Sequence, residues 1–241
     1  MTAKPGQIRI EPCTKRVRVY LSGHVIADSI HPLLVWESPH YPTYYFPATD
    51  VHQDLLTPDG ATAHSPSRGN AQKFTVAAGT ARAPGAAQRY GDSALDELRG
   101  HIRFDWDAMD SWFEEDEEIF VHVRSPYTRI DILPSSRHIR IEVEGTTIAE
   151  SNNARLLFET GLPIRYYIPK THTRMDLLEP SPTVTRCPYK GTAEYWSIRV
   201  GDQLHEDAAW SYRTPLPESQ KIAGYIAFWK VDIYVDGVLQ G

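Results

Sequence analysis

The chain has 241 residues, a formal net charge of −6 and a hydrophobic content of 41%, which fits one large or two small globular domains. The acidic balance argues against general nucleic-acid binding, and no apolar run is long enough to span a membrane. Two cysteines are too few for a disulfide framework, and the first residues lack the apolar segment of a secretory signal, so we expect a cytoplasmic, reduced protein.

Strands and turns are predicted through the first half of the chain. Residues 16–23, RVRVYLSG, are predicted to open copy 1 in the same way as copy 2, with a half-buried strand, and residues 92–100 are a candidate short helix. The run of residues 114–118 is entirely acidic, which is typical of a solvated linker. Residues 118–123 are predicted as a strand, so the joining segment is expected to pack on one domain.

The second half opens with strict alternation. Ile139, Ile141 and Val143 alternate with polar residues, which indicates a half-buried strand, and Glu144-Gly145 then makes a hairpin turn. Further strands are predicted at residues 146–151, 154–160, 164–169, 194–200, 223–229 and 231–237, with a second hairpin turn at residues 201–202 and a short helix at residues 217–224.

A shift of 122 positions superimposes the two halves of the chain. Residues 16–78 then lie on residues 138–200 without a gap, with 18 identical pairs in 63. Average composition gives roughly one identity in sixteen by chance. The chain is therefore a tandem duplication of one domain of about 100 residues, and not a solenoid of short repeats.

The expected fold is mostly β, with two tandem copies of a small antiparallel barrel-like or folded-sheet domain and at most short helices. The expected boundaries are residues 1–113 for copy 1, 114–136 for the acidic linker and 137–241 for copy 2.

Polar residues that both copies keep are the first candidates for chemistry. Glu37 lies on Glu159, which follows the apolar run 156–158 and is therefore expected to be partly buried. A buried carboxylate is paired or has a raised pKa, which suits a general acid or base.

Residues that only copy 2 carries are the second set of candidates. Residues 187–196 keep the Pro, Gly and Ala positions of copy 1 but replace its other side chains with Cys, Tyr, Lys and Trp, while residues 207–212 have no clear counterpart. A fold needs its turns in both copies, whereas a site needs its side chains once, so function is predicted in copy 2. The alternative is that the two copies differ here only because the sequence of a surface loop has drifted.

The predicted site combines acid–base residues with a pocket wall. Glu159 and Asp207 are expected to do acid–base work, and Lys190 to hold an anionic group. Aromatic residues in strands also serve as core, and a free Cys is most often a small buried hydrophobe, so these alternatives stay open. The predicted ligand-binding residues are Arg165, Tyr167, Cys187, Tyr189, Tyr195, Trp196, Trp210 and Tyr212.

Neither a metal nor a cofactor is expected. The chain has no phosphate-binding loop, no dinucleotide fingerprint, no zinc-protease helix motif and no nucleophile elbow. His172 and His205 could meet Cys187 only through the fold, since their spacing gives no metal signature.

The string RYYIPKTHTRMDLLEPSPTVTRCPYKGTAEYWSIRV, followed by EDAAWSY and IAGYIAFW, resembles an uncharacterised family of bacteria and fungi. That family is catalogued as a domain of unknown function and is sometimes labelled nucleotidyltransferase-like. The first half also resembles its two-copy members through YPTYYFP and FDWDAMDSWFEEDEE. The resemblance implies a compact β-rich domain and brings no agreed activity.

The sequence therefore predicts a small-molecule-binding protein or a cofactor-independent acid–base enzyme with its pocket in copy 2. The alternative is a non-catalytic interaction or structural module. The partner is an unknown small molecule, with no nucleic acid and no membrane, and a homodimer is left open.

Overall fold

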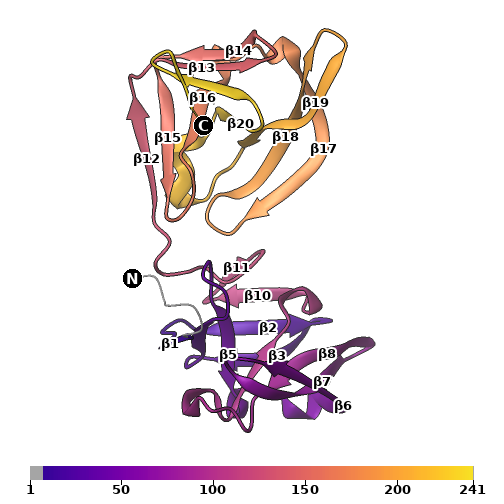
Figure 1. The fold of residues 1–241 in the computed structure, drawn as a ribbon. Coiled ribbons are helices and arrows are strands. Elements are labelled where there is room, and N and C mark those ends of the chain that lie inside the picture. Colours follow the sequence, from indigo (N-terminus) through magenta and orange to yellow (C-terminus); the bar gives the residue numbers. More distant parts are fainter. Residues whose placement is uncertain (1–7, 241) are drawn as a thin grey trace. The chain divides into compact units, whose positions relative to one another are not determined.

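The computed structural model describes residues 8–240 and divides the chain into two units, the first ending at Ser125 and the second beginning at Pro126. Both units are built from antiparallel strands with short 3-10 helices (Figure 1). The mostly-β prediction is confirmed, and every sheet is open. No helix in the described part of the chain is long and apolar enough to cross a membrane.

The first unit contains two sheets. The four-stranded sheet has the order β11 (Glu117–Ile119), β10 (Ser111–Glu114), β2 (Val17–Leu21), β3 (His24–Ser29). The seven-stranded sheet has the order β1 (Arg9–Pro12), β4 (Leu33–Trp36), β5 (Thr43–Pro47), β9 (His101–Phe104), β8 (Ala81–Arg89), β7 (Gly69–Ala78), β6 (Leu56–Ser65).

The second unit repeats this topology strand for strand. Its four-stranded sheet has the order β14 (Thr146–Ser151), β13 (Ile139–Val143), β21 (Asp232–Val235), β22 (Val238–Leu239). Its seven-stranded sheet has the order β12 (Ile130–Ser135), β15 (Ala154–Glu159), β16 (Arg165–Pro169), β20 (Tyr225–Phe228), β19 (Gln203–Tyr212), β18 (Gly191–Val200), β17 (Leu178–Cys187).

Short 3-10 helices punctuate the strands of both units. The two candidate helices of the sequence are confirmed as short turns, η3 (Asp96–Leu98) and η7 (Pro217–Ile222). The others are η1 (Ala48–Asp50), η2 (Gln53–Leu55), η4 (Trp106–Ala108), η5 (Lys170–His172) and η6 (Met175–Leu177).

The expected joining segment of residues 114–136 is shared between the two units. The strand expected at residues 118–123 is shorter, because only Glu117–Ile119 pairs, with β10 of the first unit. The strand β12 pairs with β15 of the second unit. Since β12 is equivalent to β1, the second copy begins before the residue 137 expected from the sequence.

Two-residue turns fix the register of the opening hairpin in each unit. In the first unit, φ is 50° at Ser22 and 74° at Gly23; in the second, it is 50° at Glu144 and 75° at Gly145. Positive φ at both central residues matches the right-handed twist of the flanking strands, and glycine adopts it without a steric penalty. The alternating pattern then points Val17 and Val19 inward, as predicted for such a strand.

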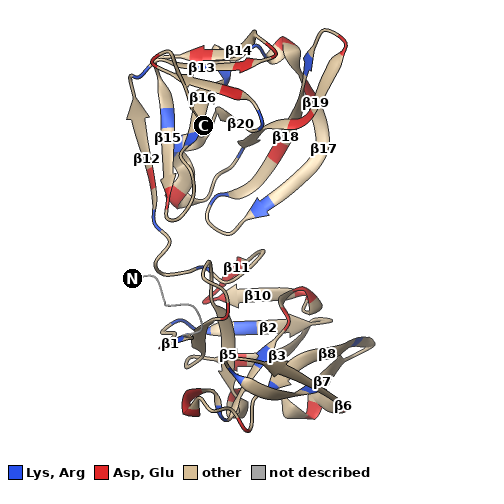
Figure 2. Cartoon of the chain, viewed as in Figure 1, with Lys and Arg blue, Asp and Glu red and all other residues tan. Residues whose placement is uncertain are grey.

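Each seven-stranded sheet has apolar residues on both faces. One face packs on the four-stranded sheet, through a cluster that contains Ile139 and Ile226 in the second unit. The opposite face is curled on itself and encloses a second, smaller cluster that contains Tyr167 and Tyr212, with Ile222 of η7 in contact. Basic and acidic residues are interspersed along both units in the view of Figure 2. The curled face of copy 2 carries most of the predicted site.

Candidate functional site

An ion pair joins the two ends of the curled sheet in the second unit. Glu159 ends β15, and Lys190 lies in the turn between β17 and β18; their Oε2 and Nζ atoms are 2.5 Å apart. The side chains are only 9% and 11% exposed. Because β15 is second from one edge of the sheet and β18 is second from the other, the pair holds the curl together. Two residues predicted from the sequence thus meet in space.

Two buried tyrosines lie on the same inner face as this ion pair. Burial raises the pKa of Tyr167 above its usual value, and the neighbouring Cys187 and Glu159 raise it further. Burial also raises the pKa of Tyr212, which the same two groups influence. The ring of Trp210 meets that of Tyr167 edge-on, with centroids 6.5 Å apart and an interplanar angle of 82°. Both tyrosines are therefore neutral hydroxyls at physiological pH.

A row of flat side chains continues along this face, and we call it the planar strip: Tyr195, Trp210, Arg165 and Trp229. The rings of Tyr195 and Trp210 have centroids 6.4 Å apart. The guanidinium of Arg165 lies 5.9 Å from the ring centroids of both Trp210 and Trp229. Trp229 is 47% exposed and the other three are half-buried, so the strip has one flank in the core and one in solvent.

The remaining predicted residues of the turn between β17 and β18, Cys187 and Tyr189, lie near Lys190 of the ion pair. Cys187 pairs with Gly191 at the base of the turn and packs against the inner cluster. Tyr189 is half-buried, and its carbonyl accepts a hydrogen bond from Ser219 of η7. The turn is thus fastened to the short helix that closes the curl.

Copy 1 closes the same position with a network of charges. The carboxylate of Glu37, equivalent to Glu159, pairs with Arg68 at 2.5 Å and with Arg103 at 2.9 Å. The hydroxyl of Tyr45 donates to the same carboxylate at 2.6 Å, and Arg68 donates to that hydroxyl at 2.7 Å. Every oxygen of Glu37 is therefore occupied by the protein itself.

The two copies differ most on this inner face. In copy 2, Ala227 stands where copy 1 has Arg103, which leaves Glu159 with a single cation partner. The planar strip replaces residues that are not aromatic in copy 1. The copy 1 residues at the positions of Tyr195, Trp210, Arg165 and Trp229 are Lys73, Gln88, Thr43 and Asp105.

Trp196 does not belong to this face, contrary to its inclusion in the predicted pocket. Successive residues of a strand point to opposite sides of the sheet, so Tyr195 and Trp196 cannot share one face. Trp196 packs against the cluster between the two sheets, and the Nζ of Lys170 lies 4.7 Å from its ring centroid. A single pocket lined by Glu159, Lys190 and Trp196 is therefore not formed.

Asp207 lies at a bulge of β19 and not in the ion-pair cluster. Its carboxylate accepts a hydrogen bond from Thr183 at 2.7 Å, and hydrogen bonds from Ser181 and Thr183 lower its pKa. It has a left-handed φ of 51°, and Gly85 has a φ of 65° at the same place in copy 1. Residues 207–212 thus do have a counterpart, residues 85–90, which the sequence comparison stopped short of.

Two residues of this face were missed by the sequence analysis. Trp229 and Ala227 lie beyond the gap-free part of the repeat, where the offset between copies changes from 122 to 124. When residues 101–105 are aligned with residues 225–229, Ala227 takes the position of Arg103 and Trp229 that of Asp105. The sequence repeat therefore already contained the two differences between the copies at these positions.

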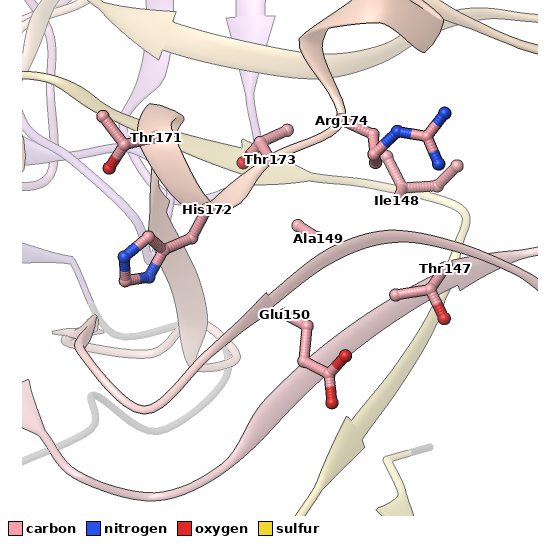
Figure 3. Close-up of a pocket in the computed structure, with 8 residues that line it drawn as sticks. All are labelled: Thr147, Ile148, Ala149, Glu150, Thr171, His172, Thr173 and Arg174. Carbon is pink, nitrogen blue, oxygen red and sulfur yellow. The ribbon is translucent and has the colours of Figure 1, made fainter.

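An open groove in the second unit and a smaller cavity in the first unit contain no predicted site residue. The groove has a volume of about 360 Å³, and in it Thr147, Ile148, Ala149 and Glu150 face the segment Thr171, His172, Thr173 and Arg174 (Figure 3). Its charges are already paired, Glu150 with His138 and Arg174 with Asp176. The other, of about 160 Å³, lies in the first unit.

No metal centre is formed within residues 8–240, since no three His, Cys, Asp or Glu side chains converge there. His172 instead contacts the hydroxyl of Ser151 at 2.8 Å, and His205 lies 3.4 Å from Glu144.

Comparison with known proteins gives one family match. No curated protein matches the chain. A family model described as a domain of unknown function (DUF427, NTP_transf_9) matches residues 9–115 and again residues 131–239. The two matches coincide with the two structural copies, including the first strand of each, which confirms the predicted resemblance. The chain therefore belongs to the DUF427 family, as a two-copy member.

Proposed function

We propose that copy 2 binds a small ligand that has a flat ring and an anionic group, and that the planar strip holds it. The observation that carries this proposal is the difference between the copies at one position of one framework. Copy 1 fills the inner face with a closed charge network, whereas copy 2 has aromatic rings and an arginine with an exposed flank.

The rings provide the surface for a planar group. Tyr195 and Trp210 are inclined by only 30° to each other, so a flat ligand that covers one ring extends over the next. Aromatic contacts of this kind contribute about 0.5–1.5 kcal/mol beyond the burial of apolar area.

Arg165 provides the charge. Its guanidinium lies over two indole rings, and it donates to no carboxylate within residues 8–240. A guanidinium binds carboxylate or phosphate through two parallel hydrogen bonds, which are about twice as strong as neutral ones. An aromatic carboxylate and a nucleoside monophosphate share this chemistry.

Acid–base catalysis by Glu159, Lys190 and Asp207 has less support than binding. Glu159 and Lys190 neutralise each other, and the carboxylate of Asp207 hydrogen bonds to Thr183 at a bulge. We therefore assign Lys190 to holding the curl, and the anion to Arg165.

Isothermal titration calorimetry of the full chain with 4-hydroxybenzoate and with adenosine monophosphate tests the proposal. The matched variants place the copy 1 residues in copy 2, as Trp210→Gln and Arg165→Thr. Arg165→Thr is expected to weaken binding at least tenfold, because a hydrogen bond to a charged group contributes about 1.5–3 kcal/mol. Trp210→Gln is expected to weaken binding severalfold, because a ring contact contributes about 0.5–1.5 kcal/mol beyond the burial of apolar area. Preference for one of the two probes separates carboxylate from phosphate recognition.

The control variant is Trp196→Phe, which also introduces a copy 1 residue but on the opposite face of the same strand. It is expected to bind as the wild type does. Equal affinity of Trp210→Gln, Arg165→Thr and the wild type would exclude the planar strip as the site, as would the absence of heat with both probes.

A second candidate function is protein interaction, and it has its own observation. Phe158, Leu162 and Ile164 are 37%, 55% and 40% exposed around the turn between β15 and β16. Light scattering of the wild type and of Leu162→Ser with Ile164→Ser tests self-association: a dimer that these changes dissociate favours it, and a monomer in both argues against it.

A further inference from the structure

We propose that the planar strip of copy 2 selects a ligand whose anionic group is a phosphate monoester, with Lys230 as a second cation beside Arg165. This inference rests on the function proposed above and narrows it from two classes of anion to one. The observation that carries it is that two cations lie against the exposed indole at the end of the strip, whereas a carboxylate is matched by one guanidinium.

Lys230 directly follows Trp229, in the short turn between β20 and β21. Its Nζ lies 5.5 Å from the ring centroid of Trp229, and the guanidinium of Arg165 lies 5.9 Å from the same centroid. Trp229 is 47% exposed, and Lys230 is exposed as well. A ligand at this end of the strip therefore meets two cations that solvent can reach.

The charges of these two cations are not compensated by the protein. Within residues 8–240, neither Arg165 nor Lys230 forms an ion pair with a carboxylate, and Glu159 on the same inner face is already neutralised by Lys190. Two like charges beside one ring repel each other. A dianion compensates both of them, whereas a monoanion leaves one positive charge in excess.

The order of the groups along the strip fits a ring that carries a phosphate. Arg165 contacts the indoles of both Trp210 and Trp229, at 5.9 Å from each centroid. A ring that covers Tyr195 and Trp210 therefore has its anionic substituent at Arg165, where Trp229 and Lys230 follow.

The two side chains suit the two charges of a phosphate monoester. A planar guanidinium binds two phosphate oxygens through parallel hydrogen bonds, and a lysine ammonium acts as a compact charge toward the third oxygen. A phosphate monoester carries about two negative charges above pH 7, because its second pKa is about 6, whereas a carboxylate carries one. The flexible stem of Lys230 lets its amine exchange an exposed ring contact for a stronger charge-assisted hydrogen bond.

Copy 1 has the opposite charge at this place. Asp105 occupies the position of Trp229, and Thr43 stands where copy 2 has Arg165. Residues 105–110, the longer copy 1 counterpart of this turn, contain three aspartates and no lysine. The paired cations are therefore specific to copy 2, as the aromatic rings of the strip are.

The backbone of Lys230 has an unfavourable conformation. Its φ is 57°, in the left-handed region that glycine and asparagine adopt more readily than lysine does. Unfavourable backbone conformations cluster at ligand-binding sites, where a particular side chain is needed. Recognition of an anion by the amine accounts for a lysine at this position.

Phenyl phosphate and phenyl sulfate separate the charge of the ligand from its shape. Both probes have one ring and one tetrahedral anionic group, but at about pH 8 the phosphate carries two charges and the sulfate one. We expect isothermal titration calorimetry of the full chain to show at least tenfold tighter binding of phenyl phosphate. Adenosine monophosphate is accordingly expected to bind more tightly than 4-hydroxybenzoate.

Lys230→Gln is expected to weaken the binding of phenyl phosphate about tenfold and that of phenyl sulfate about twofold, so that the two affinities converge. Arg165→Thr is expected to weaken both at least tenfold. The matched control is Lys170→Gln, which also removes an amine from an indole, that of Trp196 at 4.7 Å, but on the opposite face of the sheet. It is expected to bind both probes as the wild type does, and unfolding curves show whether each variant is folded.

The outcomes distinguish this inference from the function on which it rests. Equal affinity of the wild type for the two probes, or an unchanged ratio of affinities in Lys230→Gln, would overturn the inference. If Arg165→Thr still weakened both probes in that case, the planar strip would remain the binding site. Absence of binding by either probe would overturn the inference and the proposed function together.

Discussion

At the scale of single residues, the same buried carboxylate has different partners in the two copies. Glu37 is held by guanidinium groups, which stay charged at every accessible pH, whereas Glu159 is held by the amine of Lys190. In copy 2, the negative charge of Glu159 is therefore neutralised by one ammonium group, that of Lys190. Removing it leaves a carboxylate that is 9% exposed without a cation.

We expect Lys190→Met to lower the free energy of unfolding of the second unit by about 3–5 kcal/mol, because an uncompensated charge stays buried. The double variant Lys190→Met with Glu159→Leu is expected to lose much less, since both charges are gone. Urea unfolding measures both, with Lys221→Met as the control on an exposed lysine whose amine donates to a backbone carbonyl, that of Ile132, at 3.3 Å. Equal losses in the single and double variants would show that the two groups are not coupled.

The sequence predicted the participants of this ion pair but not their contact. Burial of Glu159 followed from the apolar run before it, and Lys190 was singled out because it lies in the altered turn. Their meeting depends on the curl of a seven-stranded sheet, and no local pattern encodes which distant strands a curl brings together. The prediction placed Asp207 beside Glu159 for the same reason. Its hydrogen-bond partner, Thr183, lies on β17, which the sequence could not show to be its neighbour.

At the scale of elements, alternation is the most informative pattern. It predicted the opening strands correctly, and it also decides that Tyr195 and Trp196 lie on opposite faces. Assigning both to one pocket overlooked this period of two. The register within each hairpin is set by its turn, which was predicted from the sequence at Glu144-Gly145, and the structure has the same turn at Ser22-Gly23.

The first hairpin offers a direct test of this turn chemistry. Ser22 has a φ of 50° and precedes Gly23, a position where asparagine is favoured. Ser22→Asn is expected to raise the unfolding free energy of the first unit by about 0.5 kcal/mol, and Ser22→Val to lower it by about 1–2 kcal/mol. Thermal unfolding followed by circular dichroism measures both. A stabilised Ser22→Val variant would contradict a turn with positive φ at both positions.

At the scale of the whole molecule, the duplication was predicted from identities that begin at Arg18, which set the second copy's start too late. Around the first strand of each copy, the same shift matches Ile8 with Ile130, Ile10 with Ile132 and Pro12 with Pro134, a signal too short to separate from chance. The structure and the family match both include that strand. Each unit also has its own pair of apolar clusters, which is the requirement for independent folding.

We therefore expect a fragment of residues 126–241 to fold cooperatively, and a fragment of residues 137–241 to be markedly less stable. The shorter fragment lacks β12, so β15 becomes an unpaired edge and the buried side chain of Ile132 is lost. Chemical denaturation and amide exchange compare the two. Equal stability of both fragments would show that the second domain begins at residue 137 after all.

The prolines of the outermost strands have a consequence for how two copies coexist in one chain. Strand β17 carries Pro180 and Pro182, and strand β6 carries Pro58, at the open edge of each large sheet. A proline presents no amide hydrogen, so these edges cannot serve as full templates for another strand. Two copies with one topology invite exchange of equivalent strands while the chain folds. The prolines therefore disfavour hydrogen bonding between an edge strand of one copy and a strand of the other copy, and so reduce mispairing between the copies during folding.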